Sequence, residues 1–192
     1  MLKILLYTML GGIVINNLAF DRLLGICPII GGSSTGKKSL VTGVLITLVM
    51  LVSTAICWPL QYFFLTPNKL LYLEPLVYVI VVVDILVVLE LLVREEFKDS
   101  LGLYFPVIAL NSAVLGITLN NSVNPNGLHG YDMYLDAVVA SLGAGLGFLL
   151  AMLLFAGVKS RIKQKNVPAA FKGLPVSVLA AAIMAMAFAA FK

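Results

Sequence analysis

The sequence predicts an all-α integral membrane protein whose six transmembrane helices form two inverted three-helix repeats. Of its 192 residues, 61% are hydrophobic and 11% are charged, whereas soluble domains average about 45–50% and about 25%. Its apolar runs continue for about 20 residues, the length that crosses about 30 Å of hydrocarbon. An odd number of spans in each half forces the two halves to cross the membrane in opposite orientations. We therefore expect one membrane domain over residues 1–192, with halves at about 1–98 and 99–192.

The six predicted spans are apolar runs with approximate ends. They are residues 2–20, 40–65, 71–93, 101–119, 135–158 and 174–191. The first run lacks a basic region followed by a small-residue cleavage site, so we interpret it as a span and not as a removable signal peptide. The third run is rich in valine, isoleucine and leucine, but its length and its lack of turn residues favour a helix over a buried strand.

The basic residues are distributed unevenly between the two sides of the membrane. Connections 1–2, 3–4 and 5–6 contain ten of the thirteen: Arg22, Lys37, Lys38, Arg94, Lys98, Lys159, Arg161, Lys163, Lys165 and Lys172. The opposite side has three: Lys3, Lys69 and Lys192. Because cytoplasmic loops carry an excess of lysine and arginine, these connections are predicted to be cytoplasmic. Both termini should then lie on the outer, periplasmic side of a prokaryotic inner membrane.

Each predicted half opens with an apolar segment that asparagine and glycine interrupt, at 14–25 and at 108–116. Lipid cannot satisfy the backbone groups of a broken helix, so a break persists where protein, ligand or water covers it. Paired interruptions of this kind indicate a midplane site. We expect Pro28 to break the first span and Pro106 to act similarly in the fourth, before Asn111. The alternative is a kinked helix packed on small residues.

Two carboxyl groups fall inside the third predicted span. A carboxylate in hydrocarbon costs about 2.5–3.5 kcal/mol on insertion scales, so it normally faces a cavity or a partner. Asp84 is therefore a candidate cation or proton site, or else a protonated acid bonded to a neighbouring helix. Glu90 is a second candidate ion or proton site, but a structural pair with Arg94 one turn further on is favoured.

The remaining features favour structural roles. Gly143, Gly145 and Gly147 form a small-residue face that permits close packing, within the protein or against a partner. His129 lies in an Asn- and Gly-rich loop without a second ligand at metal spacing. The sequence contains no Ser-His-Asp arrangement, paired acid-base carboxylates or dinucleotide fingerprint, which excludes a self-sufficient active site.

Several segments together resemble a known family. Residues 14–28 (Val-Ile-Asn-Asn-Leu-Ala-Phe-Asp-Arg-Leu-Leu-Gly-Ile-Cys-Pro) are similar to the opening of the A-type subunit of the Rnf ion-translocating oxidoreductase. Residues 111–116 (Asn-Ser-Ala-Val-Leu-Gly) resemble its Asn-Cys-Ala-Val-Leu-Gly, and residues 167–173 resemble its Val-Pro-x-x-Phe-x-Gly segment. The E-type subunit of the sodium-translocating NADH:quinone oxidoreductase is a close relative. The similarity covers essentially the whole chain.

The resemblance implies a membrane subunit of a redox-driven ion translocase, one that is not catalytic alone. Such a subunit pairs with a homologous six-helix partner, the E-type subunit of the Rnf complex, and assembles with flavoproteins and iron–sulfur proteins. In this family a [2Fe–2S] cluster lies between the pair, near the membrane midplane, held by two cysteines from each subunit. It relays electrons from the side of ferredoxin or NADH to flavins on the outer side, coupled to Na⁺ or H⁺ transport.

By the same resemblance, Cys27 is an iron ligand, whereas the second family cysteine is here Ser112. A hydroxyl is a harder and weaker iron ligand than a thiol. Four outcomes are open: ligation by a serine alkoxide, a cluster with fewer protein ligands, loss of the cluster, or an engineered change. Cys57 is not expected to substitute, because it lies on the second span outside either interrupted segment.

Two rival hypotheses remain. One is a stand-alone secondary transporter whose midplane site consists of Asn16, Asn17, Asn111 and Asp84. The other is a scaffold that keeps the fold but has lost the redox centre.

Overall fold

A computed structural model of the chain describes residues 2–32, 36–92, 111–122, 130–162, 168 and 171–190. Throughout these residues the ordered elements are helical, without strands, as the composition predicts. The elements are α1 (Leu2–Leu10), the π-helical turn η1 (Gly11–Ile15), α2 (Ile26–Gly32), α3 (Gly36–Leu60), the π-helical turn η2 (Gln61–Leu65), the 3-10 turn η3 (Leu71–Leu73), α4 (Glu74–Leu92), α7 (Ser112–Ser122), α8 (Tyr131–Arg161) and α9 (Leu174–Ala189).

Three helical stretches in the described part of the chain are long and apolar enough to cross a membrane: Lys38–Leu65, Leu71–Leu91 and Tyr131–Arg161. They correspond to the second, third and fifth predicted spans. Shorter apolar helices, Lys3–Ile13 and Leu174–Ala189, fall within the first and sixth. Half of the fourth, with Pro106, lies outside the described residues, and α7 covers the rest.

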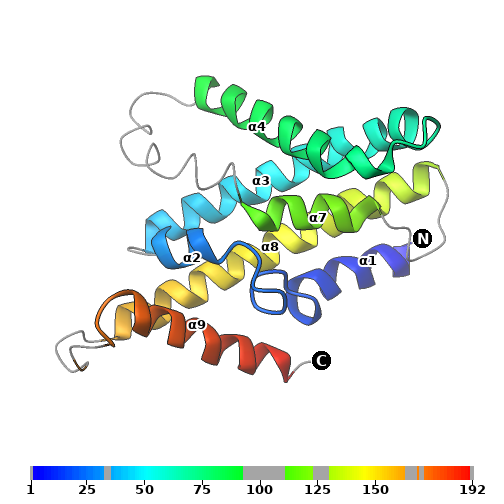
Figure 1. The fold of residues 1–192 in the computed structure, drawn as a ribbon. Coiled ribbons are helices and arrows are strands. Elements are labelled where there is room, and N and C mark those ends of the chain that lie inside the picture. The colour runs from blue at the N-terminus through cyan, green and yellow to red at the C-terminus, as the bar shows by residue number, and fades with distance from the viewer. Residues whose placement is uncertain are drawn as a thin grey trace.

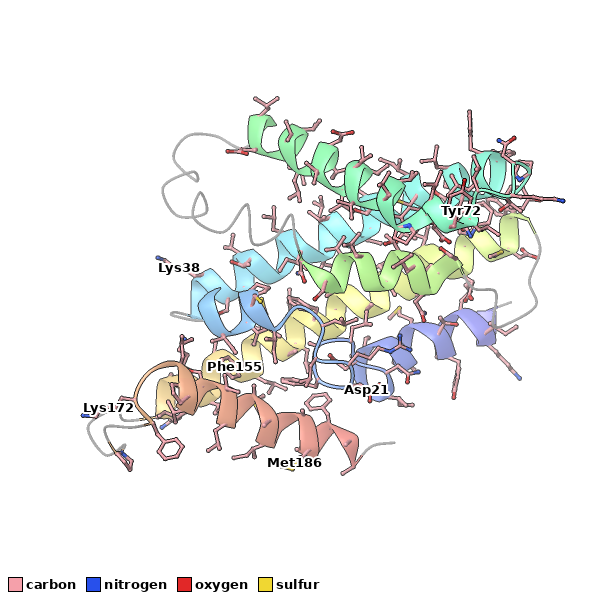
Figure 2. All side chains as sticks on the ribbon, in the orientation of Figure 1. Asp21, Lys38, Tyr72, Phe155, Lys172 and Met186 are labelled. Atoms are coloured by element: carbon pink, nitrogen blue, oxygen red, sulfur yellow. The ribbon has the colours of Figure 1, made fainter. Side chains whose placement is uncertain are left out.

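The long helices run side by side in alternating directions (Figure 1). Helix α8 passes through the middle of the bundle and packs most extensively on α3, while α4 and α9 lie on opposite sides. Helices α1, α4 and α8 run one way, and α3, α7 and α9 run the other way. Figure 2 shows Lys38 and Lys172 at the end of the bundle opposite to Tyr72. The described basic residues of the predicted cytoplasmic connections thus include two that share one end.

Glycines allow α8 to approach its neighbours closely, as the small-residue face predicts. A Cβ at Gly143 would lie 2.6 Å from the Met9 carbonyl oxygen, and one at Gly147 would lie 2.7 Å from the Gly12 carbonyl oxygen. Gly145 faces α3 instead, where Thr47 donates a hydrogen bond from Oγ1 to the Gly145 carbonyl oxygen at 3.0 Å. The glycines therefore pack α8 within the protein, against α1, η1 and α3.

Substituting Gly143 by alanine is expected to destabilise the protein by about 1–3 kcal/mol, because the added Cβ meets backbone atoms that cannot move aside. The matched control is Gly157→Ala in the same helix, where nothing lies within 4 Å of an added Cβ. That control should be neutral or slightly stabilising, since alanine is the better helix former. Thermal unfolding of the detergent-purified variants checks this, and equal midpoints for the two would contradict it.

Candidate functional site

The first span is interrupted between Asn16 and Gly25, where the chain leaves the helix. Asn17, which is 1% exposed, holds this break against α8. Its amide nitrogen donates to the carbonyl oxygens of Ile13 and Gly147, both at 2.9 Å. Its Oδ1 accepts a hydrogen bond from the Ala19 backbone N–H at 3.1 Å. One side chain thus replaces three hydrogen bonds that lipid cannot supply.

The described part of the second interrupted segment begins with the same arrangement. Asn111 is 2% exposed, and its Oδ1 accepts a hydrogen bond from the Ala113 backbone N–H at 3.0 Å. This bond caps α7, which starts at Ser112. Both segments therefore contain an Asn-x-Ala turn in which the asparagine oxygen binds the backbone N–H two residues later. The interruptions share a local structure, as well as a composition.

The two interrupted segments meet at one junction. The Gly25 backbone N–H donates to the Ser112 Oγ at 2.9 Å, across a separation of 87 residues. Gly25 has a φ of +74°, and an added Cβ would lie 2.7 Å from Asn111 Oδ1 and 2.7 Å from a ring carbon of Phe148. Only glycine fits both this conformation and this space. The junction thus depends on Gly25 as much as on Ser112.

Cys27 lies just beyond this junction, in the first turn of α2. It follows Gly25 by two residues, so their Cα atoms are at most about 7.6 Å apart. The Cys27 and Ser112 side chains are both exposed, whereas Cys57 is buried within α3 at 1% exposure. The structure therefore brings the two predicted ligand positions to the same junction and leaves the second cysteine inside the bundle.

The expectation that Pro28 breaks the first span is wrong. Pro28 is buried within α2, one position after Cys27, and the break precedes it at Asn16–Gly25. Proline is tolerated in the first turn of a helix because the N–H it lacks has no intrahelical acceptor there. Lys159 fixes the far end of α2 by donating from Nζ to the Ile30 carbonyl oxygen at 2.9 Å.

The break is also anchored on its other side by α9. The ring of Phe20, which is 3% exposed, packs on the ring of Phe188 with centroids 4.7 Å apart. Figure 2 shows Asp21 in the same connection between α1 and α2. Contacts to α8 and α9 thus position the chain that leads to Cys27.

The two acids predicted on α4 lie away from this junction. Asp84 is exposed in a groove between α3 and α4, and Glu90 is exposed nearer the end of α4. The proposed partner of Glu90, Arg94, lies outside the described residues, as does His129. Sequence reasoning missed Asp136 of α8, which is 9% exposed and accepts a hydrogen bond from Thr8 Oγ1 at 2.9 Å. A carboxylate at the start of an apolar run was the available signal.

A polar cavity of about 260 Å³ lies between the first break, α7 and α8. Its polar lining residues are Tyr7, Thr8, Asn16, Arg22 and Asn120. Of the four residues predicted for a transporter site, only Asn16 lines it. Asn17 and Asn111 are buried in the turns described above, and Asp84 lines a different cavity.

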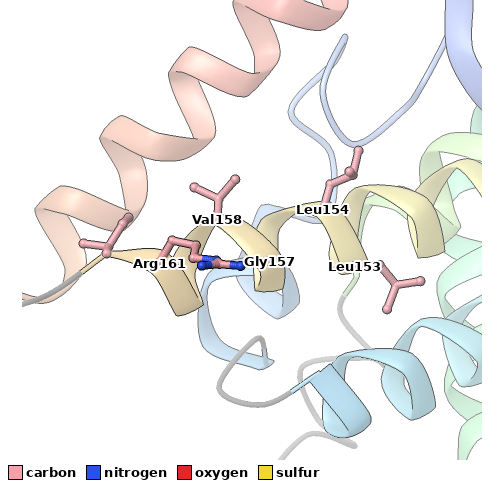
Figure 3. Close-up of a pocket in the computed structure, with 6 residues that line it drawn as sticks. Leu153, Leu154, Gly157, Val158 and Arg161 are labelled. Atoms are coloured by element: carbon pink, nitrogen blue, oxygen red, sulfur yellow. The ribbon is translucent and has the colours of Figure 1, made fainter.

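A larger cavity of about 670 Å³ follows the last turns of α8 (Figure 3). Leucine, isoleucine, valine and glycine line it together with Arg161. Its lining residues include no acid, thiol or hydroxyl, so it offers no ligand for iron or for a cation.

The junction provides part of an iron–sulfur site. Cys27 supplies a soft thiol, Ser112 supplies a hydroxyl, and the buried Asn111 amide nitrogen beside Ser112 has no hydrogen-bond partner. Within the described residues no three His, Cys, Asp or Glu side chains gather as a metal site. Because a [2Fe–2S] cluster takes four protein ligands, the described part of this chain fits a shared site and not a complete one.

An all-helical chain with several apolar helices, and with buried asparagines at its breaks, is an integral membrane protein. The family model described as "Rnf-Nqr subunit, membrane protein" matches residues 5–192. The chain belongs to this family, which confirms the resemblance seen in its motifs.

Curated relatives match over nearly the full length, and each is the A-type subunit of its complex. The one from the ion-translocating oxidoreductase complex of Syntrophotalea carbinolica is 36% identical over 99% of this chain and 97% of its own length. The one from the Na(+)-translocating ferredoxin:NAD(+) oxidoreductase complex of Acetobacterium woodii is 34% identical over 97% of this chain and 96% of its own. The relative from Azoarcus sp. strain BH72 is 32% identical over 97% and 95%.

Proposed function

We propose that this chain is the A-type membrane subunit of an ion-translocating electron-transfer complex, and that it helps to hold a [2Fe–2S] cluster shared with a homologous six-helix subunit. Cys27 and Ser112 would hold the cluster from this side, and the partner would supply the remaining ligands. The observation that carries this proposal is the hydrogen bond from the Gly25 N–H to the Ser112 Oγ, which joins the two breaks.

The arrangement of the helices supports the inverted repeat that such a subunit requires. If α1, α3 and α4 correspond to α7, α8 and α9, every helix of the first half runs opposite to its counterpart. The packing follows the same relation, because α1 packs on α8 as α7 packs on α3. The matching turns at Asn17 and Asn111 add a local counterpart. The basic end of the bundle would then face the cytoplasm, with both termini outside.

The residues at the junction have separable tasks. When bound, the cluster would supply one-electron transfer near the middle of the membrane. Cys27 would ligate iron as a thiolate, and Ser112 offers an oxygen that already accepts the Gly25 N–H. The unpartnered Asn111 amide can donate a hydrogen bond toward the site, while Asn17 and Lys159 hold the backbone that leads to Cys27.

Anaerobic purification of the whole complex, followed by iron analysis and EPR spectroscopy, tests the proposal. We expect a [2Fe–2S] signal that remains when the soluble iron–sulfur and flavin subunits are stripped from the membrane subunits. An intact, active complex whose stripped membrane part contains no iron would exclude the cluster and favour a scaffold that has lost it.

The polar cavity favours a second candidate function, a stand-alone secondary transporter. Asn16, Asn120 and Arg22 place amide and guanidinium groups beside an interrupted helix, as at substrate sites of transporters. Solute uptake by vesicles that contain this chain alone would support that function over a role in electron transfer.

A further inference from the structure

A groove between α3 and α4 carries a single carboxyl group among branched apolar side chains. It has a volume of about 490 Å³ and is lined by Val52, Ile56, Val81, Asp84, Ile85, Val88 and Leu89. The α4 residues recur at i, i+3, i+4, i+7 and i+8, which places them on one face of the helix. The spacing and the branched side chains are those of a surface that receives another helix.

Asp84 is the residue in this groove that lipid alone cannot accommodate well. It is exposed, and it forms no hydrogen bond or ion pair with the residues that the structure describes. Other acids in the described helices are paired within the chain: Asp136 accepts from Thr8, and Glu74 accepts from Ser122. The carboxyl of Asp84 therefore needs its hydrogen-bond donor from outside the described helices.

We propose that this groove docks a transmembrane helix of another membrane subunit, and that this helix presents a hydrogen-bond donor to Asp84. The donor belongs to a lysine or arginine, or to an amide or hydroxyl side chain. Charge complementarity selects this occupant. A lipid acyl chain has no donor, and a second copy of this chain related by a twofold axis would bring acid against acid.

The inference rests on the proposed assembly into a multi-subunit complex, and adjacent valines provide a matched test of it. Val87 and Val88 are 51% and 55% exposed, but only Val88 lines the groove. We would tag this chain, solubilise the native complex and compare V88W, V87W and D84L with the unmodified protein. V88W and D84L should lower recovery of one membrane subunit by about five- to thirty-fold, the effect of losing one interhelical hydrogen bond or its packing. V87W should recover it fully.

A further variant, D84N, distinguishes the two kinds of donor. It keeps a side chain that can hydrogen-bond but removes the charge. A partner lysine or arginine would be lost with D84N as with D84L, whereas a partner amide or hydroxyl would be retained. Either result supports the inference, provided that D84L loses the subunit.

Photo-crosslinking keeps the test decisive if D84L does not accumulate in the membrane. A photoreactive phenylalanine analogue at position 88 should crosslink to a transmembrane peptide of another subunit, and the same probe at position 87 should not. Crosslinks from position 88 only to lipid, or to a second copy of this chain, would overturn the inference, as would full recovery with V88W and D84L. Failure of the unmodified chain to co-purify with any other subunit would instead contradict the proposed function.

Discussion

Replacing Cys27 by alanine is expected to abolish the [2Fe–2S] signal of the membrane subunits, while replacing Cys57 by alanine leaves it unchanged. Cys27 is exposed beside the junction of the two breaks, whereas Cys57 is buried in α3. A cluster that already has a serine in place of one thiol has no spare soft ligand, so losing Cys27 removes the main attachment on this side.

EPR spectroscopy and iron analysis of the anaerobically purified complexes measure this effect. Iron should fall by the two atoms of one cluster in the Cys27→Ala complex and should not fall in the Cys57→Ala complex. Recovery of all subunits in both preparations controls for assembly. Unchanged iron and an unchanged spectrum for Cys27→Ala would show that Cys27 is not a ligand.

The second large effect is expected for Gly25→Ala. A φ of +74° disfavours alanine by about 1–2 kcal/mol. The new Cβ would also press on Asn111 Oδ1 and on Phe148, an overpacking that costs about 1–3 kcal/mol. The substitution should therefore destabilise the chain and separate the Gly25 N–H from the Ser112 Oγ. Thermal unfolding and iron content both report this effect.

Gly173→Ala is the matched control for Gly25→Ala. Gly173 also has a positive φ, of +85°, but nothing lies within 4 Å of an added Cβ. It should therefore show the conformational cost alone and keep the cluster. If both variants lower the unfolding midpoint equally and both keep their iron, the close contact at Gly25 has no role in the site.

The long helices could be predicted from the sequence because apolar length alone defines them. The run predicted at 71–93 is found as η3 and α4, and the run at 135–158 is the centre of the longer α8. Helix α8 extends to Tyr131 and Arg161 because polar residues such as Asp132 and Lys159 occupy its ends, beyond the apolar run that hydropathy detects.

The position of the first break was harder to predict. Proline is a strong helix breaker only in a helix interior, and the sequence alone does not show that a new helix starts at Ile26, just before Pro28. Asparagine and glycine correctly indicated both interrupted segments. Their individual roles depend on contacts distant in sequence, such as Asn17 with Gly147, which are 130 residues apart.

The candidate site was predicted in part. The family motif indicated Cys27 and Ser112, but composition and spacing carry no signal for the bond that joins Gly25 to Ser112 across 87 residues. Asp84 was predicted with either a cation or a neighbouring helix as its partner. The groove that contains it favours a helix, and that helix belongs to another chain.

The central claim is that the junction of the two breaks holds the cluster from this side, with Ser112 at a ligand position. A redox titration of the cluster monitored by EPR, in the unmodified complex and in Ser112→Cys, tests it most directly. Because thiolate is a softer ligand for iron than a serine oxygen, the account predicts a higher midpoint potential and altered g values in Ser112→Cys. The same potential and the same spectrum in both complexes would contradict it.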